Sequence, residues 1–508
     1  MSDAFRYSRP EGLDLESEPR LSVAIIVACR GGRAKLDLTL ASLAALNYPA
    51  DLHTVYVVDD GSDPKLSLPD VRPTHTNLTY FPNEGSAWGK AAASNFQVLS
   101  CTEDVLWFID ADLVVHPDHL AHHMKWHHES DDYLVLGWKR FVEQWDYHPD
   151  TLHQSLINNE FDSLHSESLG HDYWEARVDS TDQLRNPGLE SFRALVGATF
   201  SMTRKNWNEI GGYNPDFRTA EDNELGWRSM LHGMRFVPEG AAKSWHLGIT
   251  TFENNRELML EHNNPNLANY IPELSHLRGK SGIHWAVPET EVFLDCRDIT
   301  FKDFMSLVGQ LTSDVKGQAI FHLFGPWPEL ETRYKFTDDP NRDLRQIQRW
   351  VSSDPRFSFI VTRDNSILRI NEILDFIEIL STPFILFAEG NIGTKVQAGN
   401  LKASLLKAGT GLEGAVDSID NRIFMLFAPA VARAKLLSGD TYKNLERTWG
   451  VHWNTLDALN KPYRNWYFRV IPFGKYSIRR LFQVRSIEQL RGLFQSAYKI
   501  FSARFSKK

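Results

Sequence analysis

Short apolar runs on either side of an amphipathic segment are the feature that most restricts the fold of this chain. The run 21–28 is apolar apart from Ser22, and the segment after it carries leucines at helical spacing at 36, 40 and 43. A second apolar run, 54–58, follows. Two buried strands joined by an amphipathic helix form a βαβ unit, which belongs to a parallel sheet. We therefore expect an α/β fold whose ligand site lies at the carboxyl ends of the strands.

Polar side chains follow three of the predicted strands. They are Arg30, Asp59, Asp60, Asp110 and Asp112. The last two stand at i and i+2 after an apolar run, so both carboxylates can point to one side. Oxygen ligands suit Mg²⁺ or Mn²⁺, and such a cation can neutralise a departing diphosphate. In the alternative interpretation, the two aspartates merely cap the next turn.

The segment around Gly89 and Lys90 precedes an alanine-rich stretch that predicts a helix. The N-terminus of a helix with a lysine beside it favours an anion. The alternative is a well-formed helix whose small side chains simply pack on the sheet.

Histidines at 119, 123 and 127 recur every four residues. One helix face would then carry three potential metal ligands. Because no acidic or cysteine partner completes a recognisable site, we favour a half-solvated surface helix over a zinc site.

The region 138–189 is rich in aromatic and polar residues and poor in periodicity. Trp138, Trp145 and Trp174 are candidates for stacking on a sugar, since an aromatic face complements the C–H face of a pyranose. The same side chains could instead form the core of an irregular insertion.

A carboxylate pair, Glu221 and Asp222, stands at the start of a predicted helix, with Glu224 one turn later. The positive end of the helix dipole favours a charged carboxylate, so Asp222 can accept a proton. Helix capping alone is the alternative role. A single histidine, His246, stands at the end of a later predicted strand.

In this order, the motifs resemble the catalytic domain of family 2 glycosyltransferases with the GT-A fold. The resemblance extends roughly from Leu21 to Gly248 and is strongest to the bacterial chondroitin-polymerase type and to related galactosyl- and N-acetylgalactosaminyltransferases. Two motifs differ from the usual family pattern: Cys29-Arg30-Gly31 follows the first strand, and Arg218-Thr219-Ala220 precedes the carboxylate pair.

The resemblance implies a role for each of these residues. Asp60 and Arg30 would contact the base and ribose of a nucleotide, with Asp59, Lys90 and Asp110 also at the nucleotide. Asp110, Asp112 and His246 would hold Mn²⁺ or Mg²⁺.

On the acceptor side, Asp222 would be the catalytic base, with Glu221 beside it. Glu224, Trp138, Trp145 and Trp174 are the acceptor candidates. The implied reaction is inverting transfer from a UDP-sugar to a hydroxyl of a glycan or lipid-linked glycan, in surface polysaccharide biosynthesis.

Length and composition restrict the alternatives. A chain of 508 residues is too long for one ordinary core and predicts two or three domains. A net charge of −10 argues against nucleic-acid binding. Three scattered cysteines form no disulfide pattern, so we expect a reducing cytoplasm. No apolar run approaches the length of a membrane span, so any membrane contact would be peripheral.

The second half repeats the layout of the first. We predict a polar extension at 1–20, a catalytic domain at 21–285 and a degenerate GT-A-like domain at 286–472. In this copy, Ala388 and Gly390 replace the aspartate pair. We therefore expect a pseudo-transferase without metal or base; an unrelated α/β domain is the alternative.

The remaining segment, 473–508, is a predicted basic amphipathic tail. From about residue 475 it could lie on an anionic membrane or pack on the protein. Two other functions stay open from the sequence: a nucleotidyltransferase on the same fold, and a non-catalytic carbohydrate-binding or scaffold protein.

Overall fold

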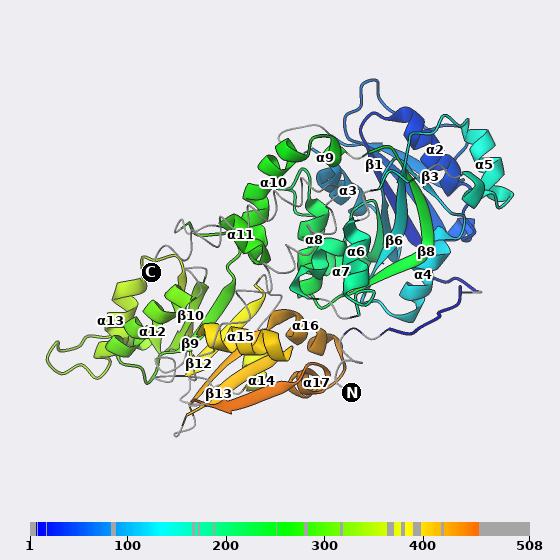
Figure 1. The fold of residues 1–508 in the computed structure, drawn as a ribbon. Coiled ribbons are helices and arrows are strands. Elements are labelled where there is room, and N and C mark those ends of the chain that lie inside the picture. Colours follow the sequence, from blue (N-terminus) through cyan, green and yellow to red (C-terminus); the bar gives the residue numbers. More distant parts are fainter. Residues whose placement is uncertain are drawn as a thin grey trace, which may run out of the picture. The chain divides into compact units, whose positions relative to one another are not determined.

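Two sheets with flanking helices make up the computed structural model (Figure 1). It describes residues 7, 9–16, 18–82, 88–164, 168–170, 173–185, 188–249, 251–278, 283–314, 319–362, 370–376, 382–389, 398–417 and 421–456. The described residues up to 456 belong to one compact unit. The predicted tail and Gly390 lie outside the described residues.

The first sheet has eight strands in the order β3-β2-β1-β4-β7-β6-β8-β5. Their bounds are β1 Val23–Cys29, β2 His53–Asp59, β3 Thr76–Tyr80, β4 Val105–Ile109, β5 Leu113–Val115, β6 Tyr133–Val142, β7 Thr199–Thr203 and β8 Arg235–Leu247. Strands β1, β2, β3 and β4 run parallel, and β7 pairs antiparallel with β4 and β6. The predicted parallel βαβ unit is confirmed.

The helices of the first half lie on both faces of this sheet (Figure 1). They are α2 Arg33–Leu43, α3 Lys90–Val98, α4 His119–Glu129, α5 Pro149–Ile157, α6 Tyr173–Ser180, α7 Arg204–Ile210, α8 Glu221–Leu231, α9 Thr251–Asn254, α10 Arg256–Tyr270 and α11 Ser275–Arg278. Leucines of α2 pack with alternate residues of β1, and alanines of α3 pack with Val58 and Phe81 on the other face. Strands β1 and β4 are buried because helices cover both faces.

The second sheet has seven strands in the order β11-β10-β9-β12-β14-β13-β15. Their bounds are β9 Thr290–Asp295, β10 Ala319–Gly325, β11 Phe357–Val361, β12 Phe384–Glu389, β13 Leu412–Val416, β14 Arg422–Phe427 and β15 Val451–Thr455. Strand for strand, this order and its parallel and antiparallel pairings match those of the first sheet, except that β5 has no counterpart among the described strands. The predicted fold class is confirmed.

The helices of the second half are α12 Phe301–Asp314, α13 Arg342–Val351, α14 Ile370–Phe376, α15 Ala398–Ala408, α16 Ala428–Leu436 and α17 Thr441–Thr448. Short 3₁₀ segments also occur, at η1 Ala50–Leu52, η2 Phe161–Leu164, η3 Leu189–Ala194, η4 Pro272–Leu274 and η5 Trp327–Glu331. None of the described helices is both long enough and apolar enough to cross a bilayer.

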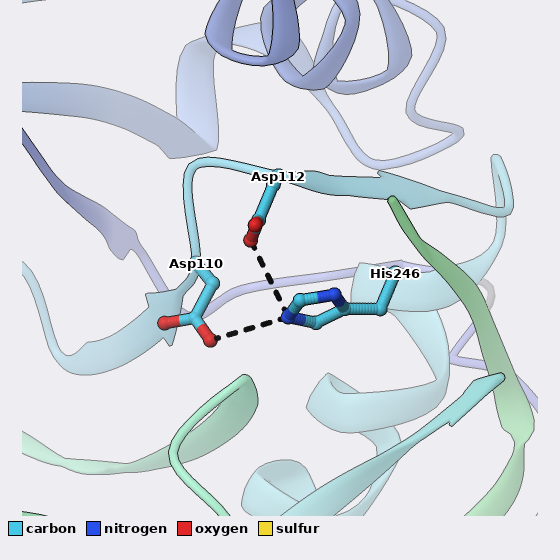
Figure 2. A group of neighbouring side chains, drawn as sticks. All are labelled: Asp110, Asp112 and His246. Carbon is cyan, nitrogen blue, oxygen red and sulfur yellow. Dashed lines mark ion pairs between the residues drawn. The ribbon is translucent and has the colours of Figure 1, made fainter. Parts of the chain in front are cut away.

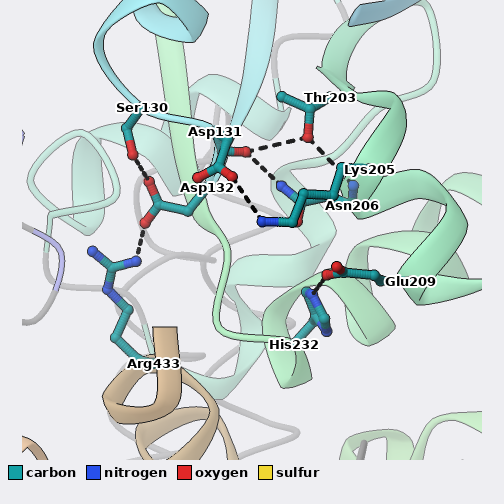
Figure 3. A network of polar contacts seen from close by, with 9 residues as sticks. All are labelled: Ser130, Asp131, Asp132, Thr203, Lys205, Asn206, Glu209, His232 and Arg433. Atoms are coloured by element: carbon teal, nitrogen blue, oxygen red, sulfur yellow. Dashed lines mark hydrogen bonds and ion pairs between the residues drawn. The ribbon is translucent and has the colours of Figure 1, made fainter. Parts of the chain in front are cut away.

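An ion-pair network joins the start of β6 to α16 (Figure 3). Asp132 pairs with Arg433 of α16 and also accepts hydrogen bonds from Arg235, at 2.6 Å and 2.9 Å. Asp132 and Arg433 are buried. The first and second halves of the chain therefore meet through a buried carboxylate that two guanidinium groups share.

Candidate metal and active site

The site is built where the central strands of the first sheet end. Strand β4 stops at Ile109, and the amide of Asp110 donates to the carbonyl of Ala198 at 2.9 Å. Asp112 immediately precedes the short strand β5, whose first residue, Leu113, lies opposite His246 on β8. The antiparallel pairing of β5 with β8 thus brings a histidine distant in sequence beside the two aspartates.

Asp110, Asp112 and His246 point toward one another (Figure 2), and one ligand atom from each lies within 4.8 Å of the others. His246 Nε2 is 3.8 Å from Asp110 Oδ2 and 3.4 Å from Asp112 Oδ1. Within the described part of the chain, no other three acidic, histidine or cysteine side chains converge in this way. Two carboxylate oxygens and an imidazole nitrogen are ligands that Mn²⁺ accepts.

The environment of His246 shows that this donor set fits a cation. Its Nδ1 lies 3.3 Å from the carbonyl of Gly248, an arrangement that favours a proton on Nδ1. The Nε2 lone pair then faces two carboxylates, and a cation between them would relieve the repulsion. The group can therefore hold a divalent metal.

Two lysines surround the group. Lys90 pairs with Asp110 and donates to the carbonyl of Gly197 at 2.7 Å; Lys35 lies 3.3 Å from Asp112 Oδ2. Burial alone would raise the pKa of Asp110, but the positive charge of Lys90 outweighs it and holds that pKa below its ordinary value. Asp110 is therefore an anion at neutral pH.

Asp222 lies at the start of α8, as predicted. Its Oδ2 accepts a hydrogen bond from the amide of Gly197 at 2.9 Å, and its Oδ1 accepts from the Asn223 amide at 2.7 Å. The backbone of Gly197 thus contacts Asp222 through its nitrogen and Lys90 through its oxygen. A Cβ on Gly197 would lie 3.2 Å from Lys90 Nζ and 3.3 Å from Asp222 Cβ, which explains why a glycine fits here.

Glu221 is buried beside Asp222. Burial, followed by the charge of Asp222, raises the pKa of Glu221 to about 7. Near neutral pH, Glu221 therefore readily holds a proton.

One cavity of about 480 Å³ joins these groups. Its lining residues are Lys90, Asp110, Lys139, Phe141, Trp174, Val196, Gly197, Ala198, Arg218, Thr219, Ala220, Glu221, Asp222, Asn223, His246, Phe252, Glu253 and Met259. We call Asp110, Asp112 and His246 the metal-type group. Two of its members, Asp110 and His246, line the same cavity as the carboxylate pair at the start of α8.

The predicted nucleotide residues follow the neighbouring strand ends. Asp59 accepts hydrogen bonds from the amides of Ser62 and Leu66, at 2.8 Å and 2.9 Å, and so shapes the loop after β2. Asp60 accepts from the amide of Gly89 at 2.8 Å, and burial raises its pKa. Arg30 is exposed after β1, and its charge acts on Asp60. Asp60 thus connects the loop after β2 to the start of α3.

The four acceptor candidates lie in different surroundings. Trp174 lines the cavity, and the ring of Trp138 packs against it with centroids 4.4 Å apart. Trp145 belongs to a buried cluster with Trp245 and does not line the cavity. Glu224 is buried and accepts two hydrogen bonds from Arg228. The structure therefore brings only Trp174 to the cavity wall.

The expectation of a half-solvated histidine face on α4 was wrong. His119, His123 and His127 are buried, and their ring nitrogens contact the hydroxyls of Thr199 and Ser201 on β7. Burial lowers the pKa of His119 and of His127 to about 3. These histidines are neutral core residues.

Sequence reasoning missed Lys35 and Lys139. Lys35 acts through contacts with a distant segment, and no local pattern marks it. Lys139 did leave a signal, because it interrupts the apolar strand β6 with a charge.

Comparison with known proteins defines the class to which the first half belongs. Residues 19–260 match the model of a family described as "Glycosyltransferase like family 2". The strand order, the site and this match make the first half a glycosyltransferase family 2-like domain of the predicted GT-A type.

Individual relatives are more distant. A stretch of 109 residues, 21% of this chain, is 32% identical to the beta-monoglucosyldiacylglycerol synthase of Synechocystis sp. and covers 22% of that protein. Among solved structures, the chain is similar to the mannosyltransferase PcManGT from Pyrobaculum calidifontis in complex with GDP-Man and Mn²⁺, at 17% identity over 48% of this chain and 61% of that one, with a TM-score of 0.31.

It is also similar to residues 1–349 of S. aureus TarS, at 16% identity over 51% of this chain and 68% of that one, with a TM-score of 0.32. The chain thus spans less than two thirds of both the curated relative and the mannosyltransferase.

Proposed function

We propose that this protein is an inverting, metal-dependent glycosyltransferase that transfers a sugar from a UDP-sugar to a hydroxyl group. The observation that carries the proposal is the shared cavity: Asp110 and His246 of the metal-type group line it together with Asp222. Transfer from a nucleoside diphosphate sugar needs a way to stabilise the departing diphosphate and a base for the acceptor hydroxyl. The two halves of this cavity supply those two functions.

Asp110, Asp112 and His246 are the residues that would hold Mn²⁺ or Mg²⁺. Such a cation, when bound, supplies charge stabilisation for a diphosphate. Lys90 and Lys35 add positive charge at the same strand ends. Asp60 and Arg30 lie at the ends of β2 and β1 next to them, and we assign these two residues to the base and ribose.

Asp222 is the proposed general base. Backbone amides of Gly197 and Asn223 hold its two oxygens, which fixes the carboxylate at the cavity wall. A base that takes the acceptor proton while a diphosphate leaves from the opposite face gives a single displacement. The anomeric centre is then inverted, by the geometry that also governs inverting glycosidases.

We further propose a glycan or lipid-linked glycan as acceptor. By its name, the relative from Synechocystis sp. is a synthase of monoglucosyldiacylglycerol. In this chain, the basic residues of the predicted tail would bring the enzyme to an anionic membrane surface on the cytoplasmic side. Surface polysaccharide or glycoconjugate synthesis is the process that these features suit.

For the second half, we propose a pseudo-transferase domain. The expectation that Ala388 replaces Asp110 was wrong by one position, because the strand register puts Glu389, the last residue of β12, in the place of Asp110. Arg422 pairs with Glu389 through its side chain and donates its amide at 2.8 Å. A guanidinium group here neutralises the carboxylate, and a cation would have to displace it.

Release of UDP from UDP-sugars tests the proposed function. We expect the full-length protein to release UDP in the presence of Mn²⁺ and to stop when EDTA is added. Asp112→Ala should abolish all transfer, and Asp222→Asn should abolish transfer while the protein still binds UDP. Asp150→Asn, on the exposed start of α5, is the control and should behave as wild type.

Three results would contradict these proposals. UDP release that persists in EDTA or in Asp112→Ala removes the role of the metal group. Residual transfer of a second sugar by Asp112→Ala means that the second half is active. Release of pyrophosphate in place of UDP would identify a nucleotidyltransferase.

A further inference from the structure

Lys139 is a buried cation in the cavity wall that the proposed reaction does not use. It lies on β6, and the whole residue is only 2% exposed. Its Nζ lies 4.3 Å from the centroid of the Trp174 ring, and both residues line the cavity. Its hydrogen-bond donors are therefore placed at the edge of the space that a substrate would occupy.

In the described part of the chain, the side-chain ammonium of Lys139 has neither an ion pair nor a hydrogen bond; its ring contact is with Trp174. Taking an ammonium group out of water is costly unless a counter-charge replaces the lost hydration. The cation–π contact with the ring of Trp174 offsets only part of that cost. Burial lowers the pKa of Lys139 to about 8, so the side chain is still mostly charged at pH 7.

The carboxylates whose charges act on Lys139 are those of Asp110 and Asp222. Asp110 is paired with Lys90, while Asp222 accepts hydrogen bonds from Gly197 and Asn223. Lys90 and Lys35 differ from Lys139 because each has a carboxylate partner in the metal-type group. Of the two lysines that line the cavity, Lys90 has a carboxylate partner, whereas no described residue forms an ion pair with Lys139.

The position of Lys139 is held by its surroundings. Arg140, the next residue on β6, pairs with Glu175 of α6, which fixes α6 and its Trp174 against the strand. Trp138 packs its ring against Trp174. The aromatic side of the ammonium is therefore closed, and the cavity is the direction from which a partner can come.

We propose that Lys139 binds an oxyanion, a carboxylate or a phosphate, that the substrates carry in addition to the donor diphosphate. The inference rests on the proposed transferase function and specifies its substrates: either the transferred sugar or the acceptor is anionic. A neutral hydroxyl would offer a lone pair but no counter-charge. The diphosphate already has Lys35, Lys90 and the metal-type group at its side of the cavity.

Paired probes and three variants test this inference in the full-length protein. The donor arm compares the Kd of UDP-glucuronate with that of UDP-glucose in Mn²⁺. The acceptor arm compares kcat/KM for methyl glucuronide and glycerol 3-phosphate with that for methyl glucoside. Lys139→Met removes the charge, Lys139→Arg keeps it, and Lys243→Met changes a half-exposed lysine outside the cavity.

We expect wild type to prefer the anionic member of one pair by roughly tenfold, since one charge-assisted contact has about that effect. The arm in which the preference appears identifies its source. Lys139→Met should abolish the preference and leave the Kd of UDP unchanged, Lys139→Arg should retain part of it, and Lys243→Met should match wild type.

The inference is overturned if wild type shows no preference in either arm. It is also overturned if Lys139→Met weakens the binding of UDP as much as it weakens the binding of the two UDP-sugars. The latter result would make Lys139 a diphosphate ligand. Failure of the proposed function differs from both, because wild type would then bind no UDP-sugar in Mn²⁺.

Lysine acetylation mapped by mass spectrometry provides a second test in the wild-type protein, which remains informative if the variants do not fold. Glucuronate or glycerol 3-phosphate should protect Lys139 and leave Lys243 reactive, whereas glucose should protect neither. Equal protection by glucose and by the anionic probes would contradict the inference.

Discussion

At the scale of single residues, the backbone of Gly197 connects the two functions of the cavity. Its oxygen accepts from Lys90, which pairs with Asp110, and its nitrogen donates to Asp222. A displacement of the Gly197 backbone would therefore affect both the metal side and the base. The absence of a side chain at 197 permits this close approach.

Gly197→Ala should reduce transfer by at least about tenfold with little change in Tm. The new methyl group would push on Lys90 Nζ and on Asp222 Cβ, at 3.2 Å and 3.3 Å, and move both from their positions. Steady-state kinetics and thermal unfolding measure the two effects. Gly240→Ala is the matched control, since a Cβ there meets nothing within 4 Å. Equal kinetics for the two variants would show that the position of the Gly197 peptide does not matter.

The buried histidines of α4 make stability dependent on pH. In the folded protein the pKa of His119 and of His127 is about 3, well below the ordinary value, and that of His123 is also lowered. Below pH 6.5 these histidines therefore bind protons in the unfolded chain but stay neutral in the folded chain. Their stabilising contribution is complete above pH 6.5 and is lost as pH falls toward 3.

His127→Gln should weaken this dependence. Each such histidine contributes a slope of about 1.4 kcal/mol per pH unit to the free energy of unfolding, and the variant lacks one. Urea unfolding at pH 4.5, 5.5 and 7.5 measures the slope in both proteins. An identical slope in His127→Gln and wild type would contradict the assignment.

At the scale of secondary-structure elements, the strand ends were predictable and the contacts between them were not. Apolar runs that stop at Asp59 and Ile109 indicate a parallel sheet, and ligand-binding side chains gather at such ends. That His246 lies beside Asp110 and Asp112 followed only from the family resemblance, because it depends on the pairing of β5 with β8. The exposure of helix α4 was predicted wrongly because histidines form its buried face. The spacing of residues in the sequence does not reveal their hydrogen bonds to β7.

The second sheet shows the same limits of prediction. Its strand order could be anticipated from repeated apolar runs, but the partner of Glu389 could not. Arg422 stands 33 positions later in the sequence, and the antiparallel pairing of β12 with β14 brings it to the carboxylate.

Arg422→Met should destabilise the protein by about 2 kcal/mol without lowering the kcat of the folded fraction. The change leaves Glu389 buried without its charged partner, and a lost bond to a charged group has a cost of this size. Urea unfolding and transfer assays measure the two properties. If Arg422→Met instead lowers kcat as much as Asp112→Ala does and leaves stability unchanged, Arg422 belongs to an active site.

At the scale of the whole molecule, charge is unevenly distributed along the chain. The protein carries a net charge of −10, whereas the segment 475–508 is basic and has apolar residues at helical spacing. The buried pair of Asp132 and Arg433 joins the two halves that precede this segment. A basic amphipathic tail after an acidic body is typical of a chain that lies on an anionic membrane through its tail.

Replacing four tail arginines by glutamine should reduce co-sedimentation with vesicles that contain anionic lipid by at least about tenfold, since each basic residue near such a surface contributes about 1 kcal/mol. The changed residues are Arg479, Arg480, Arg485 and Arg491. The matched control makes the same charge change elsewhere, at Lys205, Lys243, Arg256 and Lys302. Wild type should bind less as salt rises, because screening weakens the attraction. Equal binding by the two variants would mean that the tail packs on the protein or on a second copy, and transfer to a lipid-linked acceptor would then have to be guided by the cavity alone.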